Sequence, residues 1–182
     1  MIYIIPTDTC FGIACGFDDT QSYHRIYEIK KRPLEKPLAI MVESFEWLEQ
    51  NTELNKQQID FLKTYNKPFT VLTECPYIKM ILNLEQEDFE YQNKESYKKI
   101  AFRVAHNDIQ KKLLSEIGPI FLTSTNFSGE KEIYDISEAK KQFQNFKNIQ
   151  FLGEGIVLDN SIKPSDIFEF EGESTNITYL RQ

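Results

Sequence analysis

The chain has 182 residues, with 21 Lys and Arg against 28 Asp and Glu, which gives a formal net charge of −7 at pH 7. This length suits one domain, and a hydrophobic fraction of 41% is enough for a sizeable core. The negative charge disfavours nonspecific attraction to nucleic acid or to an anionic membrane, so a local basic cluster must act through its position.

The strongest strand signals are short apolar or alternating segments, beginning with IYII almost at the first residue. The expected strands occupy residues 2–5, 38–42, 69–74, 100–105, 120–124, 155–159, 166–170 and 176–180. We expect the last two strands to form a hairpin. Residues 83–99 are polar and poorly periodic, and we interpret them as a surface excursion.

Helices are expected between these strands wherever a capping residue precedes apolar residues at helical spacing. The expected N-caps are Thr20, Ser44, Asn55, Asn107 and Ser137. Pro33 ends the first helix near Lys31 or Arg32. Because helices and strands mix without strict alternation, the sequence predicts one α/β domain over residues 1–182, with helices on the faces of a twisted mixed sheet.

The three cysteines, Cys10, Cys15 and Cys75, are odd in number and form no CxxC pair. This argues against a disulfide framework and a zinc site, and favours free thiols in a reducing compartment. No segment approaches the roughly 18 apolar residues of a membrane span. The N-terminus has no basic region and is too short before Pro6 for a signal peptide. We therefore expect a cytoplasmic protein without a membrane segment.

The segment KKRPLEKPL, residues 30–38, carries four cations around two prolines. One interpretation is a solvated helix end, where Lys and Arg favourably meet the helix dipole. The other is a phosphate site, because the prolines stiffen the loop and fix the direction of Arg32 and Lys36.

Three further segments admit both a structural and a ligand-binding interpretation. PTDTCFG, residues 6–12, is either an ordinary turn or a polar edge at a strand's end. Arg103 lies mid-strand between Ala101 and Ala105, where a buried guanidinium needs an acidic residue or a ligand anion as its partner. TSTNFSGE, residues 123–130, is either a polar loop or a set of donors to an anion.

Other chemistries find little support. The nucleotide loops GxxxxGK[ST] and GxGxxG are missing, and the histidines are only His24 and His106. No metal-ligand set is visible, so we predict no protein metal site. What these residues predict is a site for a polyanion or a carboxylate, built from separate strand ends.

In order along the chain, these segments resemble the YrdC family of threonylcarbamoyl-AMP synthases. The matching segments are IPTDTCFGIACGF, IYEIKKRPLEKPLAIMV, IAFRVAHND, GPIFLTSTNFSGE and PSDIFEF, and they span residues 2 to about 170. The K-x-R-P-x-x-K-P-L and S-x-N-x-S-G blocks are specific when they occur together. The sequence departs from the family pattern at NKPFT, at Ala105, at Thr125 and at NSIKPSD, and it starts at a strand where the family usually has a preceding helix.

The resemblance implies a large open cavity and a reaction of L-threonine, bicarbonate and ATP that gives threonylcarbamoyl-AMP and pyrophosphate. Mg²⁺ is implied with the ATP, and a downstream tRNA threonylcarbamoyl transferase complex is implied as the consumer of the product. Lys30 and Arg32 are implied as catalytic residues. The implied ATP-binding residues are Lys30, Arg32, Lys36, Ser124, Asn126 and Ser165. The implied threonine-binding residues are Thr7, Thr9, Arg103 and Thr123.

Two alternatives stay open at this point. One is an RNA-binding or ribosome-associated module of the same type without synthase activity, which the net charge disfavours. The other is a protein that handles a carbamoyl-adenylate with a different amine, like the related domain of hydrogenase-maturation carbamoyltransferases.

Overall fold

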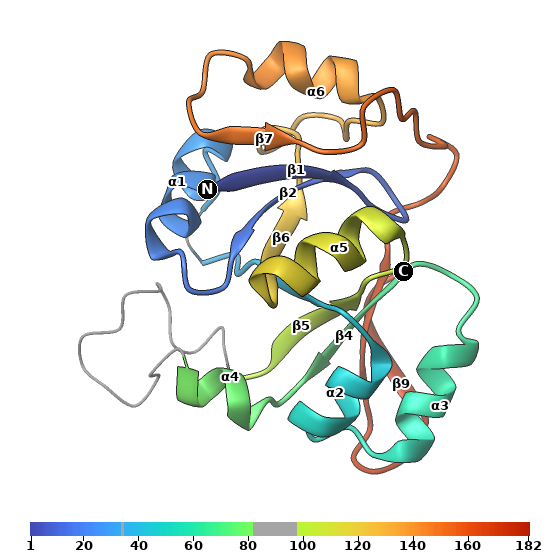
Figure 1. Ribbon diagram of the computed structural model, residues 1–182. Coiled ribbons are helices and arrows are strands. Elements are labelled where there is room, and N and C mark those ends of the chain that lie inside the picture. The colour runs from blue at the N-terminus through green and yellow to red at the C-terminus, as the bar shows by residue number, and fades with distance from the viewer. Residues whose placement is uncertain (34, 82–97) are drawn as a thin grey trace.

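A computed structural model describes residues 1–33, 35–81 and 98–182 (Figure 1). The described strands are β1 (Ile2–Pro6), β2 (Phe11–Gly16), β3 (Ala39–Val42), β4 (Phe69–Thr73), β5 (Ile100–Val104), β6 (Ile120–Ser124), β7 (Ile149–Phe151), β8 (Asp166–Phe170) and β9 (Ile177–Arg181). The described helices are α1 (Thr20–Lys30), α2 (Phe45–Asn51), α3 (Lys56–Thr64), α4 (Pro76–Ile81), α5 (Asp108–Ile117) and α6 (Ile136–Phe143).

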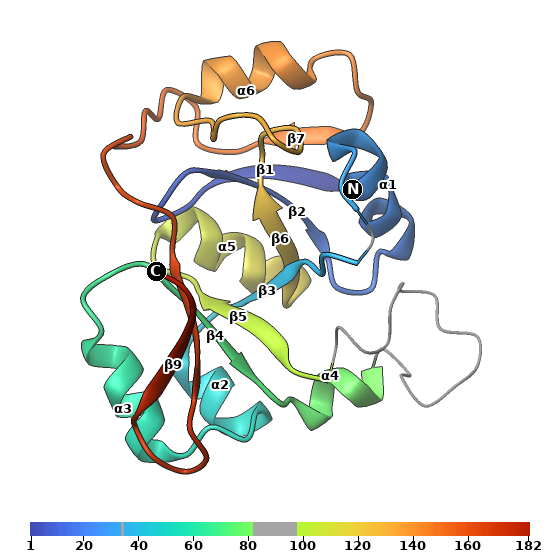
Figure 2. The same cartoon turned by 180° about the vertical axis from the view of Figure 1, so that it is seen from behind.

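The strands form one mixed sheet in the order β7-β1-β2-β6-β3-β5-β4-β8-β9. The pairs β1–β7, β3–β5 and β4–β8 are parallel, and the remaining neighbours are antiparallel. The sheet twists strongly from β7 to β9, and helices lie along it (Figures 1 and 2). The predicted α/β class and mixed sheet are confirmed, including the hairpin of β8 and β9.

Alternation along the strands divides the core between the two faces of the sheet. Ile2 and Ile4 belong to a large apolar cluster that also takes the buried sides of α1, α2, α3 and α6. Ile5 belongs to a smaller cluster, which includes Leu113 and Leu114 of α5. Helix α5 lies in front of the central strands in Figure 1 and behind them in Figure 2. One face is therefore covered by several helices and the other, in its central part, by α5.

Local capping differs from the sequence prediction in two helices. Helix α1 is capped by Asp19, whose carboxylate accepts from the Ser22 backbone N–H, so Thr20 is the first helical residue. Helix α6 is capped by Asp135 through the backbone N–H of Ser137, which was itself the predicted cap. In both cases an aspartate just upstream takes the role, because its carboxylate caps a helix as well as a hydroxyl does.

Other differences concern strands. Residues 155–159 form no strand beyond one isolated bridge of Val157 to Asp135, because Gly153 and Gly155 take positive φ values and bend the chain there. β2 and β7 were not predicted. Residues 83–97 of the predicted surface excursion lie outside the described residues.

Among the described residues, no helix has the length and apolar content needed to cross a membrane.

Candidate functional site

A cavity of about 260 Å³ opens where several strand ends meet near the middle of the sheet. Its wall is built by the ends or beginnings of β1, β3, β6, β8 and β9, together with side chains from β4 and β5. Seven predicted site residues line it: Thr7, Thr9, Arg32, Arg103, Thr123, Ser124 and Ser165. Segments that are far apart in sequence thus contribute to one site.

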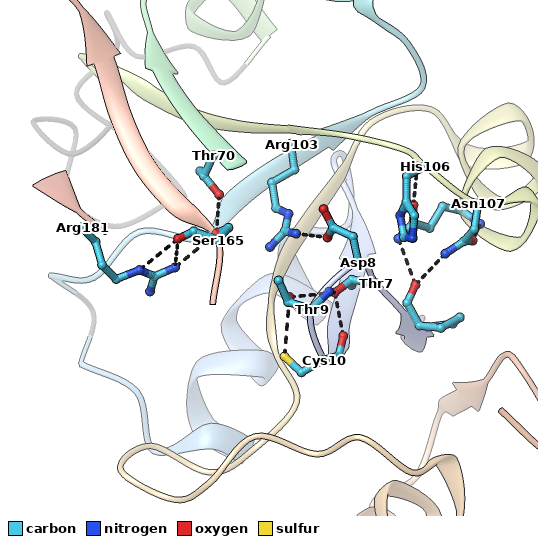
Figure 3. Close-up of polar contacts among 12 residues, drawn as sticks. Thr7, Asp8, Thr9, Cys10, Thr70, Arg103, His106, Asn107, Ser165 and Arg181 are labelled. Atoms are coloured by element: carbon cyan, nitrogen blue, oxygen red, sulfur yellow. Dashed lines mark hydrogen bonds and ion pairs between the residues drawn. The ribbon is translucent and has the colours of Figure 1, made fainter. Parts of the chain in front are cut away.

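The turn after β1 is held by its own hydroxyl groups (Figure 3). Thr7 Oγ1 donates to the Cys10 carbonyl at 2.6 Å and lies 3.1 Å from Thr9 Oγ1. The base of the turn is fixed from α5, because the side chains of Asn107 and Gln110 both donate to the Pro6 carbonyl, at 3.1 and 2.9 Å. These bonds orient Thr7 and Thr9 toward the cavity.

Gly12 makes room for this turn at the floor of the cavity. A Cβ at this position would lie 2.6 Å from Leu122 Cδ1, 3.2 Å from Thr7 Cγ2 and 3.3 Å from the Thr123 carbonyl oxygen. A side chain here would therefore push the Leu122 methyl group aside and crowd Thr7 and Thr123. The requirement for glycine is one of close approach between neighbouring strands.

Arg103 on β5 reaches the cavity and pairs with Asp8 of the turn (Figure 3). Its Nη2 donates to Asp8 Oδ1, and the Arg103 side chain is 12% exposed while that of Asp8 is 29% exposed. The ion pair predicted as the structural interpretation of Arg103 therefore exists. It does not rule out a ligand, because the Arg103 side chain makes no other hydrogen bond with a described residue and keeps free donors.

On the far side of the cavity, Arg181 at the end of β9 is anchored to Ser165 (Figure 3). The Arg181 Nη2 donates to the Ser165 carbonyl at 2.8 Å and to its hydroxyl at 3.2 Å, and Nε donates to the same carbonyl at 3.2 Å. Ser165 Oγ also lies 3.0 Å from Thr70 Oγ1. Burial, followed by the positive charge of Arg103, lowers the pKa of Arg181 from its usual value.

Arg32 enters the cavity from the loop that follows α1. The helix ends at Lys31, which has a left-handed backbone with φ of 51°. The Arg32 Nε then donates to the Lys36 carbonyl at 2.9 Å and Nη2 to the Pro37 carbonyl at 3.0 Å. The loop is further fixed by Tyr27, whose hydroxyl donates to the Lys36 carbonyl at 3.0 Å. Arg32 is thus the cation of the segment 30–38 that lines the cavity, and its predicted phosphate contact stays a prediction.

Three predicted residues do not line the cavity: Lys30, Lys36 and Asn126. Lys30 is buried with 2% of its surface exposed, and its Nζ donates to the carbonyls of Ser124 and Asn126. Burial, followed by the charge of Arg32, lowers the pKa of Lys30 from 10.5 to about 8. Lys30 thus ties α1 to the end of β6, and its predicted phosphate contact stays a prediction.

Lys36 and Asn126 are placed differently from Lys30. Lys36 is exposed in the loop after α1. Asn126 is buried, and its Nδ2 donates to the carbonyls of Phe127 and Glu130. The Asn126 Oδ1 and the neighbouring Thr125 Oγ1 are buried without a hydrogen-bond partner among the described residues. Such unpaired polar atoms are costly, and they mark the loop after β6 as a place where a ligand or water completes the bonding.

The cavity also contains residues that the sequence did not single out. They are Cys10, Thr70, Glu132, Tyr134 and Arg181. Burial raises the pKa of the Cys10 thiol, so it is a neutral lining group. Arg181 was missed because it follows an ordinary strand pattern, and no local signal tells that β9 ends at the cavity. Thr70 lies in the NKPFT segment, one of the places where the sequence departs from the family pattern.

The structure thus defines an α/β protein with an arginine-rich cavity at converging strand ends. A family model described as Sua5/YciO/YrdC, "Telomere recombination", matches residues 1–182. The chain belongs to this family, as the sequence resemblance indicated.

Two curated relatives are named threonylcarbamoyl-AMP synthase. The threonylcarbamoyl-AMP synthase of Aliivibrio fischeri is 30% identical over 169 residues, which cover 89% of this chain and 83% of the relative. The threonylcarbamoyl-AMP synthase of Pseudoalteromonas translucida is 28% identical over 144 residues, which cover 78% of this chain and 73% of the relative.

Solved structures share the fold at lower identity. YciO of E. coli has a TM-score of 0.75 at 20% identity and is matched over 100% of this chain and 82% of its own. Sua5 of P. abyssi, solved with L-threonine, has a TM-score of 0.73 at 22% identity and is matched over 99% of this chain and 49% of its own. A full-length HypF in a phosphate- and nucleotide-bound form has a TM-score of 0.75 at 20% identity, but this chain spans only 26% of it.

Proposed function

We propose that this protein is an L-threonylcarbamoyladenylate synthase, a nucleotidyltransferase that converts L-threonine, bicarbonate and ATP into threonylcarbamoyl-AMP and pyrophosphate. The observation that carries the proposal is the convergence of Arg32, Arg103 and Arg181 with threonine and serine hydroxyls around one cavity. A site of this composition suits a polyanion together with a carboxylate. The names of the curated relatives support the same reaction.

The reaction requires the protein to position the substrates and to stabilise developing charge. It requires no nucleophile from the protein, because the substrates supply both nucleophiles. The amine of threonine attacks CO₂ derived from bicarbonate and loses a proton, which gives a carbamate. An oxygen of the carbamate then attacks the α-phosphorus of ATP, and pyrophosphate leaves. The arginines hold the reacting groups in line and stabilise the charge on the phosphoryl oxygens.

The residue roles follow from their places in the cavity. Arg32 and Arg181 carry positive charge that carbonyl and hydroxyl oxygens only partly balance, and they would contact the phosphates together with Ser124 and Ser165. Arg103 would bind the threonine carboxylate beside Thr7, Thr9 and Thr123. Lys30 would act indirectly, by fixing the end of β6. It would contact a phosphate only if ligand binding drew its Nζ toward that phosphate.

Mg²⁺ would enter with the ATP phosphates and supply further neutralisation of their charge. Among the described residues, no group of three or more His, Cys, Asp or Glu could hold a metal ion. We propose that phosphates and water would hold most of the coordination positions of the ion. Glu132 lines the cavity and makes no hydrogen bond or ion pair with a described residue, so its carboxylate is the protein group that would contact the ion.

The direct test is incorporation of labelled bicarbonate into an AMP adduct, with ATP and Mg²⁺, in the presence of L-threonine, L-serine or no amino acid. A threonine-dependent adduct with equimolar pyrophosphate is the expected result. Arg25→Ala, a change on α1 outside the cavity, should keep the activity of the wild-type protein. Folded protein that binds ATP but forms no adduct with any amino acid would overturn the proposal.

A cellular role follows if the reaction holds. The product would be passed in the cytoplasm to a tRNA threonylcarbamoyl transferase complex. Direct RNA binding is the alternative, and a salt series separates the two: tight binding of RNA with a steep salt dependence, in protein without synthase activity, would favour the RNA-binding module.

A further inference from the structure

Arg103, which lines the cavity, is paired with Asp8, which lies in the adjoining turn and is not itself a lining residue (Figure 3). Arg103 comes from β5 and lines the cavity, while Asp8 comes from the turn between Thr7 and Thr9, both of which also line it. The two side chains approach from opposite directions and share a single bond, from Nη2 to Oδ1.

This single bond leaves much of each group unused. Arg103 keeps Nε, Nη1 and the second hydrogen of Nη2, and Asp8 keeps Oδ2, since neither side chain makes another hydrogen bond or ion pair with a described residue. The Asp8 side chain is 29% exposed. A two-bond contact between the same groups would have left far less for a ligand.

An α-amino acid carries a carboxylate and an ammonium on neighbouring positions, which is the complement of this pair. We propose that Arg103 and Asp8 together bind the amino-acid substrate as a zwitterion, with Arg103 on the carboxylate and Asp8 on the ammonium. The proposal rests on the proposed function in that the substrate is an amino acid, and it adds Asp8 as the residue that selects for the amine.

The structure favours this over a purely structural role for Asp8. A carboxylate that served only to balance Arg103 would lower the attraction of the cavity for any carboxylate ligand. When Asp8 also bonds the ligand ammonium, this attraction offsets the weaker attraction between the partly neutralised Arg103 and the ligand carboxylate. The two roles predict different ligand preferences, which makes them separable.

The test is calorimetric titration in bicarbonate-free buffer, with and without ATP, so that no turnover occurs. The ligands are L-threonine and its α-hydroxy analogue 2,3-dihydroxybutanoate, which keeps the carboxylate and the β-hydroxyl but lacks the ammonium. The wild-type protein should bind threonine at least about tenfold more tightly, the value of one charge-assisted hydrogen bond.

Asp8→Asn is the decisive variant. It should weaken threonine binding by about 10- to 100-fold while leaving the affinity for dihydroxybutanoate unchanged or higher. Asp18→Asn is the matched control, because Asp18 is an exposed aspartate in the turn after β2, outside the cavity. Its affinities for both ligands should equal those of the wild-type protein.

Each other outcome has a definite meaning. An equal change in the affinity for both ligands in Asp8→Asn, whether an increase or a decrease, would reduce Asp8 to a partner of Arg103 and overturn the proposal. Binding of L-serine or L-alanine instead of threonine, with the same dependence on Asp8, would support the amine-selecting role and contradict the threonine reaction. If Asp8→Asn fails to fold, the wild-type comparison decides, since no preference for threonine over dihydroxybutanoate would overturn the proposal.

Discussion

The two sides of the cavity hold their arginines with different partners. On the β5 side, Arg103 is paired with the carboxylate of Asp8. On the opposite sides, Arg181 and Arg32 are held by carbonyl and hydroxyl oxygens of Ser165, Lys36 and Pro37. A carboxylate neutralises a guanidinium, whereas neutral oxygens orient it and leave its charge in place.

This difference indicates a division of labour within one cavity. Strong positive charge on one side suits a triphosphate, and a balanced pair on the other suits a small ligand that carries both charges. The pKa of Arg181 is lowered first by burial and then by the positive charge of Arg103, so the two cations repel each other across the cavity. A bound anion would offset this repulsion between Arg181 and Arg103.

Altering the two sides of the cavity separately gives the strongest test of this division of labour. Arg32→Ala should lower kcat/KM for ATP by about 100-fold or more, because it removes charge-assisted donors to the phosphates. Arg103→Ala should instead raise KM for the amino acid, with KM for ATP within about twofold of wild type. Steady-state kinetics with each substrate varied in turn measures both values.

Circular dichroism and denaturant unfolding serve as the controls for these variants, since Arg32 also bonds its own loop. Equal effects of the two variants on both substrates would show that the sides are not distinct. Arg32→Lys sharpens the test, because it keeps the charge and loses the planar fork.

Lys30 lies two residues before Arg32, but it is buried. We therefore expect its titration to affect the free energy of unfolding rather than the contacts with ATP. Its pKa is lowered by burial from 10.5 to about 8, so between these values the unfolded chain binds a proton that the folded protein does not. Stability therefore rises with pH in this window, by at most about 1.4 kcal/mol per pH unit from this group, and gains no slope from it below pH 8.

The measurement is denaturant unfolding from about pH 7 to 10, with Lys30→Met as the reference that lacks the titrating group. The free energy of unfolding of the wild-type protein should rise relative to that of Lys30→Met above pH 8. A flat difference across the range would mean that the Lys30 ammonium stays protonated in the folded protein.

Sequence patterns predicted those parts of the site that depend on one segment at a time. The alternation of β5 placed Arg103, and the hydroxyl groups after β1 and β6 were expected at strand ends. Partner choice was not predictable, since Asp8 and Arg103 are 95 residues apart and many acidic residues could have served. Lys30 illustrates the same limit, because the rotation of α1 against β6 decides whether a cation faces the cavity or a backbone carbonyl.

Prediction of the strands from sequence was limited in a similar way. Strands with apolar or alternating segments were found, whereas β2 was missed because its sequence FGIACG has two glycines and two small residues. Its small residues are what the central position requires, since Gly12 lies against Leu122 and Thr7. β7 has three residues and is defined by its parallel pairing with β1, which no local pattern encodes.

The smallest expected effect tests the anchoring of Arg181. Ser165→Ala removes the hydroxyl that contacts both Arg181 and Thr70, but it keeps the Ser165 carbonyl, which accepts two of the three bonds from Arg181. If orientation by neutral oxygens is what this side of the cavity provides, KM for ATP should rise only about threefold, near the value of one neutral hydrogen bond. Thr70→Val, which removes the hydroxyl partner on β4, is the matched variant and should have a smaller effect. A loss of activity as large as that of Arg32→Ala would instead mean that the Ser165 hydroxyl contacts the reacting groups itself.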